Sequence, residues 1–176
     1  MTESLWKKDF RDALAAAGRV VVLGVGNLDK GDDGAGIAAA KAFARRLSPA
    51  QKRRVLVLRG GPAPENMTGK IRAFRPDLVL ILDAVLGGLT PGSVFPVDPE
   101  KIADDGVTTH QISLRWVIRY IKESIGCPVA VLGIQPKSIE FNGKISSVVE
   151  KGISNVVEFL LESLALPGRR PGPAGH

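Results

Sequence analysis

An acidic, glycine-rich segment, GVGNLDKGDDGAG at positions 24–36, follows an apolar run at positions 20–23. A turn of this kind between a strand and a helix usually cradles a phosphate through its backbone amides. Here Asp29 stands where the dinucleotide motif needs its last glycine, and Asp32 and Asp33 stand where a P-loop has lysine and a hydroxyl residue. At an effective dielectric near 20, each phosphate–carboxylate contact would cost about 4 kcal/mol. The segment is therefore expected to hold a cation.

A simpler role competes for one of these aspartates. Asp32 or Asp33 can cap the helix that is expected to begin near Gly34, because aspartate is a favoured N-cap residue worth about 1 kcal/mol. A cap needs only one carboxylate. The second aspartate therefore still calls for another explanation.

Asp83 ends the apolar run Leu78–Leu82 and begins a loop that contains Gly87 and Gly88. In open parallel sheets, ligands bind beyond the carboxyl ends of the strands, where the acidic segment must also lie. Asp83 and Asp33 are therefore expected in one region. The alternative is that Asp83 forms a turn or pairs with an arginine, since polar residues at strand ends are ordinary turn formers.

His110 is the only histidine apart from the terminal residue. Thr108 and Gln111 have capping-box spacing, so the imidazole is expected in the first turn of a helix, where the helix dipole keeps it neutral. Neutral imidazole binds metals, although a lone histidine is as often a packing or surface residue. Asp33, Asp83 and His110 would form an incomplete ligand set for a borderline divalent ion such as zinc or nickel.

Strand-like and helix-like segments alternate along the chain. Strands are expected at Arg19–Val25, Val55–Leu58, Leu78–Leu82, Ser93–Val97 and Val129–Ile134. Helices are expected at Leu5–Ala17, Ala35–Leu47, Glu65–Phe74, His110–Ile125 and Ser147–Leu164. Strands that are apolar on both faces, separated by helices, indicate the α/β class with a mostly parallel sheet between two helical layers. Ser93–Val97 is expected at an edge because prolines bracket it.

The chain has 176 residues and 44% hydrophobic content, which fits one domain with a sizeable core. We expect this domain at residues 1–166 and a disordered tail, rich in Pro, Gly and Arg, at 167–176. The net charge of +6 is scattered and only 5% of residues are aromatic, so nucleic-acid binding is not expected. Cys127 is the only cysteine, which excludes an intrachain disulfide and a thiolate zinc site. No signal peptide or bilayer-spanning stretch is visible, so a cytoplasmic location is expected.

Five segments occur in a characteristic order: GVGNLDKGDDGAG, LRGGPAPEN, ILDAVLGGLTPGSV, TTHQISL and LGIQP. Together they resemble the maturation endopeptidases of nickel–iron hydrogenases, most of all the branch that serves formate-hydrogenlyase-type and other energy-converting hydrogenases. The resemblance covers about Val20 to Leu164. It implies a three-layer αβα fold of the phosphorylase/hydrolase-like type. It also implies an aspartate-dependent endopeptidase that removes a short C-terminal extension from the large-subunit precursor after nickel insertion.

In this family the nickel-binding trio falls on Asp33, Asp83 and His110, which are thereby also the implied catalytic residues. Nickel would be supplied by the precursor, and zinc or another divalent ion would serve as a surrogate. The attacking water would be activated either by a carboxylate, with Asp33 the candidate base, or by the metal. The protein is expected to act as a monomer. The implied substrate-binding residues are Asn27, Asp32, Gly60, Gly61 and Glu65.

Two features depart from the family pattern. Arg59 precedes Gly60 and Gly61, where many members carry an aspartate with a proposed role in cleavage. The N-terminal helix at residues 3–17 and the tail at 167–176 are additions. Two other functions stay open at this point: a nickel chaperone that uses the same trio without cutting, and a self-sufficient zinc hydrolase.

Overall fold

The computed structural model describes residues 5–100, 102 and 111–165. Within these residues the sheet has five strands in the order β2-β1-β3-β5-β4. The strands are β1 (Val20–Val25), β2 (Val55–Gly61), β3 (Leu78–Ala84), β4 (Val94–Val97) and β5 (Val129–Ile134). β2, β1, β3 and β5 are mutually parallel, whereas β4 pairs with β5 in the antiparallel direction at one edge. The expected mostly parallel sheet, with the fourth strand at its edge, is confirmed.

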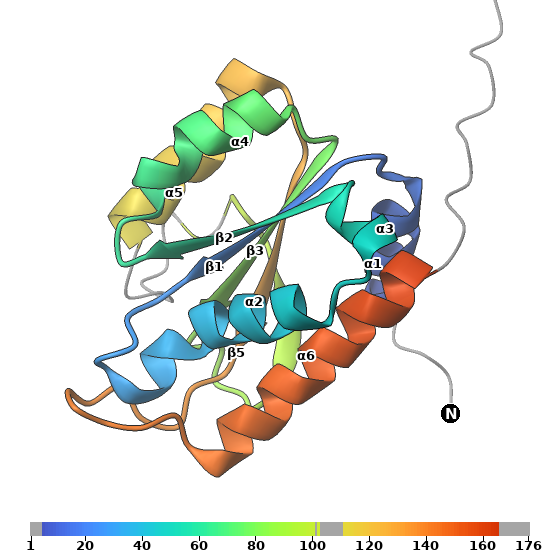
Figure 1. The fold of residues 1–176 in the computed structure, drawn as a ribbon. Coiled ribbons are helices and arrows are strands. Elements are labelled where there is room, and N and C mark those ends of the chain that lie inside the picture. The colour runs from blue at the N-terminus through green and yellow to red at the C-terminus, as the bar shows by residue number, and fades with distance from the viewer. Residues whose placement is uncertain (1–4, 101, 103–110, 166–176) are drawn as a thin grey trace, which may run out of the picture.

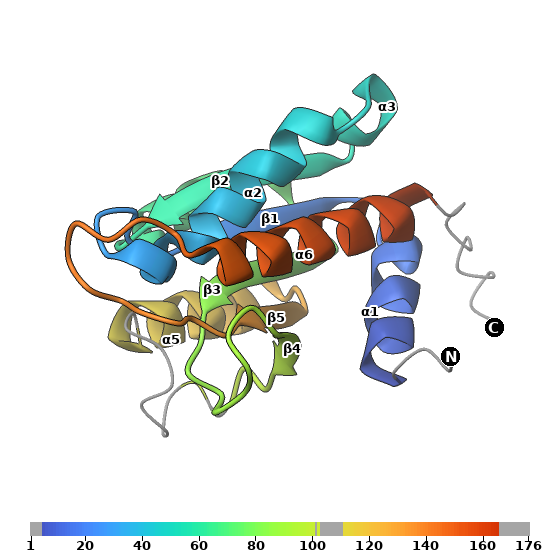
Figure 2. The same cartoon turned by 90° about the horizontal axis from the view of Figure 1, so that it is seen from below.

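Helices cover both faces of this sheet (Figures 1 and 2). They are α1 (Leu5–Ala16), α2 (Ala35–Arg46), α3 (Pro49–Lys52), α4 (Thr68–Phe74), α5 (Gln111–Tyr120) and α6 (Ser147–Ala165). Shorter helical turns are η1 (Gly31–Gly34), η2 (Pro64–Met67) and a π-helical turn, Ile121–Ile125, that continues α5. α1, α2 and α6 pack on one face, and α4 and α5 pack on the other. The three-layer αβα arrangement is therefore confirmed.

The core consists of two hydrophobic layers, one on each face of the sheet. In β1, Val20 and Val22 belong to the layer under α2 and α6, whereas Val21 and Leu23 belong to the layer under α4 and α5. Every residue of β1 and of β3 is buried. Burial on both faces explains why these strands are apolar throughout instead of alternating with polar residues.

Two strands run past the ends expected from the sequence. β3 passes Leu82 and includes Asp83, which is paired with Gly133 of β5. β2 passes Leu58 and ends at Gly61, because its pairing with β1 continues across a register shift. Both extensions reach the edge of the sheet at which the parallel strands end, which we call the carboxyl edge.

The N-terminal helix α1 packs across α6 through aromatic side chains. The Trp6 ring lies edge-on to Phe10, with centroids 5.8 Å apart, and edge-on to Phe159 of α6, with centroids 5.7 Å apart. Leu14 of α1 is fully buried in the same layer. α1 thus adds to the hydrophobic layer that α2 and α6 form on this face of the sheet, and it lies beside α6 (Figure 2).

Several expectations concern residues outside the described ranges. These are His110, the capping residue Thr108 and the tail at 167–176. No helix in the described part of the chain combines the length and the apolar character needed to cross a membrane.

Candidate active site at the carboxyl edge of the sheet

The acidic segment is pressed against the carboxyl ends of the two central strands. A side chain at Gly36, in the first turn of α2, would place its Cβ 2.1 Å from the Leu82 carbonyl oxygen and 2.4 Å from that of Val25. Only glycine permits this approach of helix to strand. η1, which carries Asp32 and Asp33 and directly precedes α2, contacts β3 as a result.

Asp33 lies buried in η1, with 1% of its surface exposed. Its Oδ2 accepts a hydrogen bond of 3.1 Å from the backbone amide of Asn27, which also approaches the Asp33 carbonyl at 3.3 Å. The N-cap residue of α2 is Gly34, without a side-chain cap bond. Neither Asp32 nor Asp33 is therefore the N-cap residue of α2. Asp33 instead closes the loop that begins at Asn27.

Asp83 is fully buried within β3 at the same edge. Its Oδ1 accepts a hydrogen bond of 2.9 Å from the backbone amide of Ala84. Because strand residues alternate between faces and Leu82 and Ala84 both belong to the layer under α2, Asp83 is directed to the face that α4 and α5 cover. The structure thus brings Asp33 and Asp83 to one edge through the contact between η1 and β3.

His110 lies outside the described residues, so its position relative to the two aspartates stays a prediction. α5, which follows it in the chain, begins at Gln111 near the carboxyl edge and runs back along the face to which Asp83 is directed (Figure 1). Within residues 5–100, 102 and 111–165, no three His, Cys, Asp or Glu side chains are grouped so as to hold a metal ion. The described members of the predicted trio are the two carboxylates.

Asp32 has a different environment from its neighbour. It is buried, and its Oδ2 accepts hydrogen bonds from the amides of Lys137 (2.8 Å) and Ser138 (3.1 Å) and from the Ser146 hydroxyl (2.9 Å). Its Oδ1 accepts a further bond of 2.6 Å from the Ser146 amide. Asp32 therefore joins η1 to both ends of the loop at residues 137–146, and its expected contact with substrate stays a prediction.

Replacing Asp32 should destabilise the protein. In Asp32→Ala, three part-buried backbone amides and one hydroxyl lose their acceptor, so we expect the free energy of unfolding to fall by roughly 2–4 kcal/mol. Urea denaturation followed by circular dichroism measures the change. Asp29→Ala is the matched control, because Asp29 is an exposed carboxylate of the same segment. Equal stability of the two variants would contradict this role for Asp32.

The other predicted substrate-binding residues lie around the same edge. Asn27 is half-buried, and its Oδ1 accepts a hydrogen bond from the Asp29 amide. Gly60 is buried, and Gly61 ends β2 with a positive φ of 64°, its carbonyl accepting a bond from the Gly26 amide. Glu65 is exposed in η2. The structure places these residues next to the acidic segment or on the strand beside it, and their role with substrate stays a prediction.

Gln135 holds the loop after β3 in place, a role that was not predicted from the sequence. It follows β5 at the carboxyl edge and is buried, with its Oε1 accepting hydrogen bonds from the amides of Gly87 (2.8 Å) and Leu89 (3.2 Å). Its amide group also donates to the Pro136 carbonyl. The available signal was the motif LGIQP, in which a polar residue directly follows an apolar strand.

Large hydrophobic side chains are exposed on the loops of this edge. They are between 37% and 69% exposed and comprise Leu28, Leu86, Leu89, Ile139 and Phe141, which we call the apolar rim. The loops follow β1, β3 and β5, the same strands that position the aspartates. The Lys30 ammonium lies 4.8 Å from the Phe141 ring centroid. Exposed apolar groups gathered around buried polar ones are typical of a site that docks another protein.

Cys127 is excluded as a nucleophile at this site. It precedes β5 at the opposite, amino edge of the sheet, and its side chain is buried. Burial raises the pKa of its thiol to about 11, so the reactive thiolate is absent at neutral pH.

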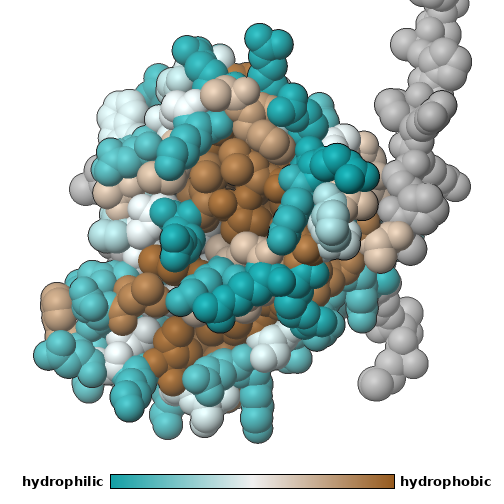
Figure 3. All heavy atoms as spheres, viewed as in Figure 1, coloured by the Kyte–Doolittle hydropathy of each residue, from teal (hydrophilic) through white to brown (hydrophobic). Residues whose placement is uncertain are grey.

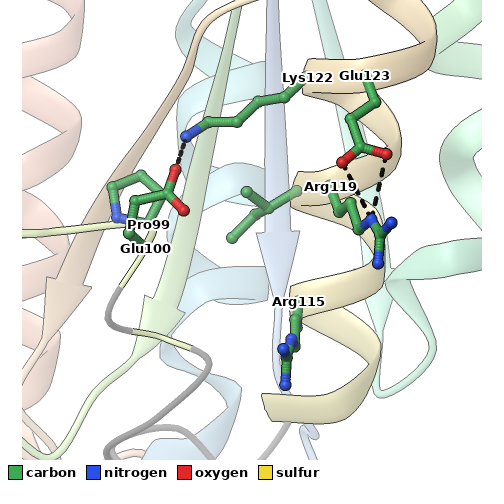
Figure 4. A pocket seen from close by; sticks show the side chains of 7 residues that line it. Pro99, Glu100, Arg115, Arg119, Lys122 and Glu123 are labelled. Atoms are coloured by element: carbon green, nitrogen blue, oxygen red, sulfur yellow. Dashed lines mark hydrogen bonds and ion pairs between the residues drawn. The ribbon is translucent and has the colours of Figure 1, made fainter.

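A separate pocket of about 430 Å³ lies between α5 and the segment after β4 (Figure 4). Four of its five charged side chains pair with one another: Lys122 with Glu100, and Arg119 with Glu123 at 3.1 Å. Neither Asp33 nor Asp83 lines it. The buried carboxylates, and not this pocket, are the chemically distinctive feature of the described residues.

Comparison with known proteins shows the family to which the chain belongs. Residues 37–163 match the family model described as hydrogenase maturation protease. The hydrogenase 3 maturation protease of Escherichia coli (strain K12) is 39% identical over 141 residues, which cover 80% of this chain and 87% of that protein. The chain belongs to the hydrogenase maturation protease family. The family assignment made from the sequence, and with it endopeptidase activity, is confirmed.

Solved structures of hydrogenase maturation proteases share the fold. The crystal structure of the [NiFe] hydrogenase maturation protease HycI from Thermococcus kodakarensis KOD1 superposes with a TM-score of 0.80 at 33% identity, covering 90% of this chain and 99% of that one. The hydrogenase maturating endopeptidase HybD from E. coli superposes with a TM-score of 0.70 at 27% identity, covering 84% and 92%. The α/β architecture that carries Asp33 and Asp83 is therefore that of the family.

Proposed function

We propose that this hydrogenase maturation protease removes the C-terminal extension of a [NiFe]-hydrogenase large-subunit precursor, and that it does so after nickel has been inserted. The observation that carries the proposal is the pair of buried carboxylates, Asp33 and Asp83, at the carboxyl edge of the sheet. Burying a carboxylate is costly unless a cation or hydrogen bonds compensate it. Hydrogen bonds from the Asn27 and Ala84 amides contribute to this compensation. Carboxylate oxygens are also ligands for divalent metal ions, so a metal ion presented by the precursor would find two of its ligands here.

The apolar rim supports a protein substrate. Leu28 and Phe141 are its most exposed side chains. Leu28 belongs to the segment that contains Asp33, and Phe141 lies beside Lys30 of that segment. A small substrate would need an enclosed cavity, whereas a folded precursor can cover a ring of exposed apolar groups around a small polar centre. Docking on the rim would direct the precursor's nickel toward the two aspartates.

In the proposed mechanism, nickel held by thiolates of the precursor completes its coordination with Asp33, Asp83 and His110. This contact fixes the scissile bond beside the protease, so binding energy is used for orientation. A water molecule then attacks the peptide carbonyl. Asp33 is the proposed general base, because it lies on the loop that also presents the Asn27 side chain, and an aspartate-dependent reaction needs a carboxylate within reach of the water. Zinc or another divalent ion in the precursor is proposed as a weaker surrogate.

We further infer that the protein acts as a cytoplasmic monomer. The single cysteine is buried and unpaired with another, which fits a reducing compartment. One copy of the chain carries both described aspartates and the apolar rim, so the proposed site needs no second copy.

The test is incubation of the purified protein with the nickel-loaded precursor, followed by intact-mass spectrometry. We expect the precursor to lose the mass of one C-terminal peptide and the protease to keep its own mass. Binding without any mass loss would instead identify a nickel chaperone. Cleavage that requires zinc bound to the isolated protein would identify a self-sufficient zinc hydrolase.

A further inference from the structure

A groove of about 360 Å³ lies between α2 and β2, at the free edge of the sheet. We call it the β2 groove. Figure 3 shows hydrophilic groups over α2, and its central hydrophobic patch lies on the other side of β2, toward α4. The groove is lined by Ala40, Lys41, Ala44, Arg45, Val57 and Arg59.

The charges of this groove are all positive. Lys41, Arg45 and Arg59 are exposed, and no carboxylate is among the lining residues. Lys41 and Arg45 are four residues apart on α2, so they lie on one face of the helix. In the described part of the chain, none of the three forms an ion pair, whereas the adjacent Arg46 pairs with Glu158 of α6. The groove is thus an uncompensated cationic strip above a small apolar floor.

The backbone of β2 can accept another strand. β2 is the last strand of the sheet on this side among the described residues, and it pairs with β1 alone. The Val20 amide donates to the Arg54 carbonyl, and ladder bonds alternate along a strand. The amide and carbonyl groups of Val57 and Arg59 are therefore directed away from β1, toward the free edge. An extended peptide can bind such an edge through main-chain hydrogen bonds.

The β2 groove leads to the site. β2 ends at Gly61, whose carbonyl accepts a hydrogen bond of 3.2 Å from the Gly26 amide at the start of the acidic segment. At about 3.3 Å per residue, the strand from Val57 to Gly61 spans roughly 13 Å. A peptide that leaves the region of Asp33 and Asp83 can therefore continue directly along the groove.

We propose that the β2 groove binds the precursor's C-terminal extension as an added, antiparallel strand that carries acidic side chains. This inference rests on the proposed function and names the part of the substrate that occupies the groove. The extension follows the scissile bond in the chain, so it runs from the site toward Val57, opposite to the direction of β2. Its carboxylates contact Arg59, Lys41 and Arg45, and its apolar side chains cover Ala44 and Val57.

This placement gives Arg59 a role that suits its position. The residue directly precedes Gly60 and Gly61, at the position where the resemblance described above implies an aspartate in many members of the family. A carboxylate at this point would repel an acidic extension, whereas the guanidinium attracts it. Arg59 is thus a specificity residue for the extension and not a group that touches the reacting atoms.

A peptide-binding experiment tests the inference without requiring cleavage. The probe is a fluorescein-labelled peptide of alternating Glu and Val, with a Lys-and-Val peptide of equal length for comparison. Fluorescence anisotropy should show binding of the acidic peptide only. Arg59→Glu should weaken it by roughly five- to tenfold, and the triple reversal of Lys41, Arg45 and Arg59 by more than roughly thirtyfold. Lys151→Glu is the control, since Lys151 is exposed on α6 outside the groove.

Methylating alternate amides of the acidic peptide tests the added strand separately from the charges. N-methylation on the edge that would pair with β2 should abolish binding, whereas methylation on the opposite edge should preserve it. Equal binding of both methylated peptides would overturn strand addition. Equally tight binding of a single-stranded oligonucleotide would show a general anion site and would also overturn the inference.

Precursor cleavage separates this inference from the proposed function. The groove variants should raise KM for the nickel-loaded precursor and leave kcat nearly unchanged. If the wild-type protein cleaves and the groove variants match its KM, the groove inference fails and the proposed function stands. If the wild-type protein does not cleave the precursor at all, the proposed function fails and this inference fails with it.

Discussion

Asp33→Asn and Asp83→Asn should each lower precursor cleavage by roughly a thousandfold or more, because each removes a charged group that, in the proposed mechanism, orients nickel and the scissile bond. His110→Ala is expected to have the same effect. Both aspartates are buried at the carboxyl edge, yet neither belongs to the hydrophobic layers that hold the helices to the sheet. The variants should therefore remain folded. Cleavage is measured by intact-mass spectrometry in single-turnover conditions.

Asp29→Asn is the matched control for these variants, because it removes an exposed carboxylate from the same acidic segment. It should retain nearly full activity. Thermal unfolding must show that the inactive variants keep a cooperative transition. A folded Asp33→Asn or Asp83→Asn protein that still cleaves at the wild-type rate would remove that residue from the proposed trio.

Precursor without nickel should not be cleaved at a measurable rate. The three proposed protein ligands include no thiolate and would give incomplete coordination, so the isolated protein should hold nickel or zinc only weakly. The precursor's thiolates would supply the remaining bonds, and metal and substrate would bind as one unit. The experiment compares nickel-loaded and nickel-free precursor at equal concentration.

A control reaction that contains a chelator strengthens this comparison. A chelator should strip free nickel from solution without stopping cleavage of precursor that was loaded beforehand. Rapid cleavage of the nickel-free precursor would defeat the proposal, since the protease would then require no signal that the metal is in place.

The parallel sheet was predictable because its strands are apolar on both faces and are separated by helical segments. β5 lies at Val129–Ile134, as expected, since a proline precedes it and polar residues follow it. α3 was missed, although Ser48 and Gln51 form a capping box that the sequence already shows. The extension of β2 to Gly61 was also missed, because pairing with β1 overrides the low strand propensity of two glycines.

The candidate site was only partly predictable. The positions of Asp33 and Asp83 followed from the general rule that strand ends of a parallel sheet share one edge. The sequence does not distinguish Asp32 from Asp33, since both are aspartates that precede the same helix. Their difference arises from residues 137–146, more than a hundred positions later, whose amides surround Asp32 alone. Gln135 escaped notice for the same reason, because its partners are on another loop.

Asp32 and Gln135 together tie the three loops of the apolar rim to one another. Asp32 joins the segment after β1 to the loop after β5, and Gln135 joins the start of that loop to the segment after β3. The proposed docking surface is consequently preorganised. Binding would then cost conformational entropy mainly in the precursor's tail and little in the loops of the protease. Cleavage severs that tail from the docked body, so the two products would hold the enzyme less tightly than the single precursor did. Product release is then built into the reaction, and one protease molecule can serve many precursors in turn.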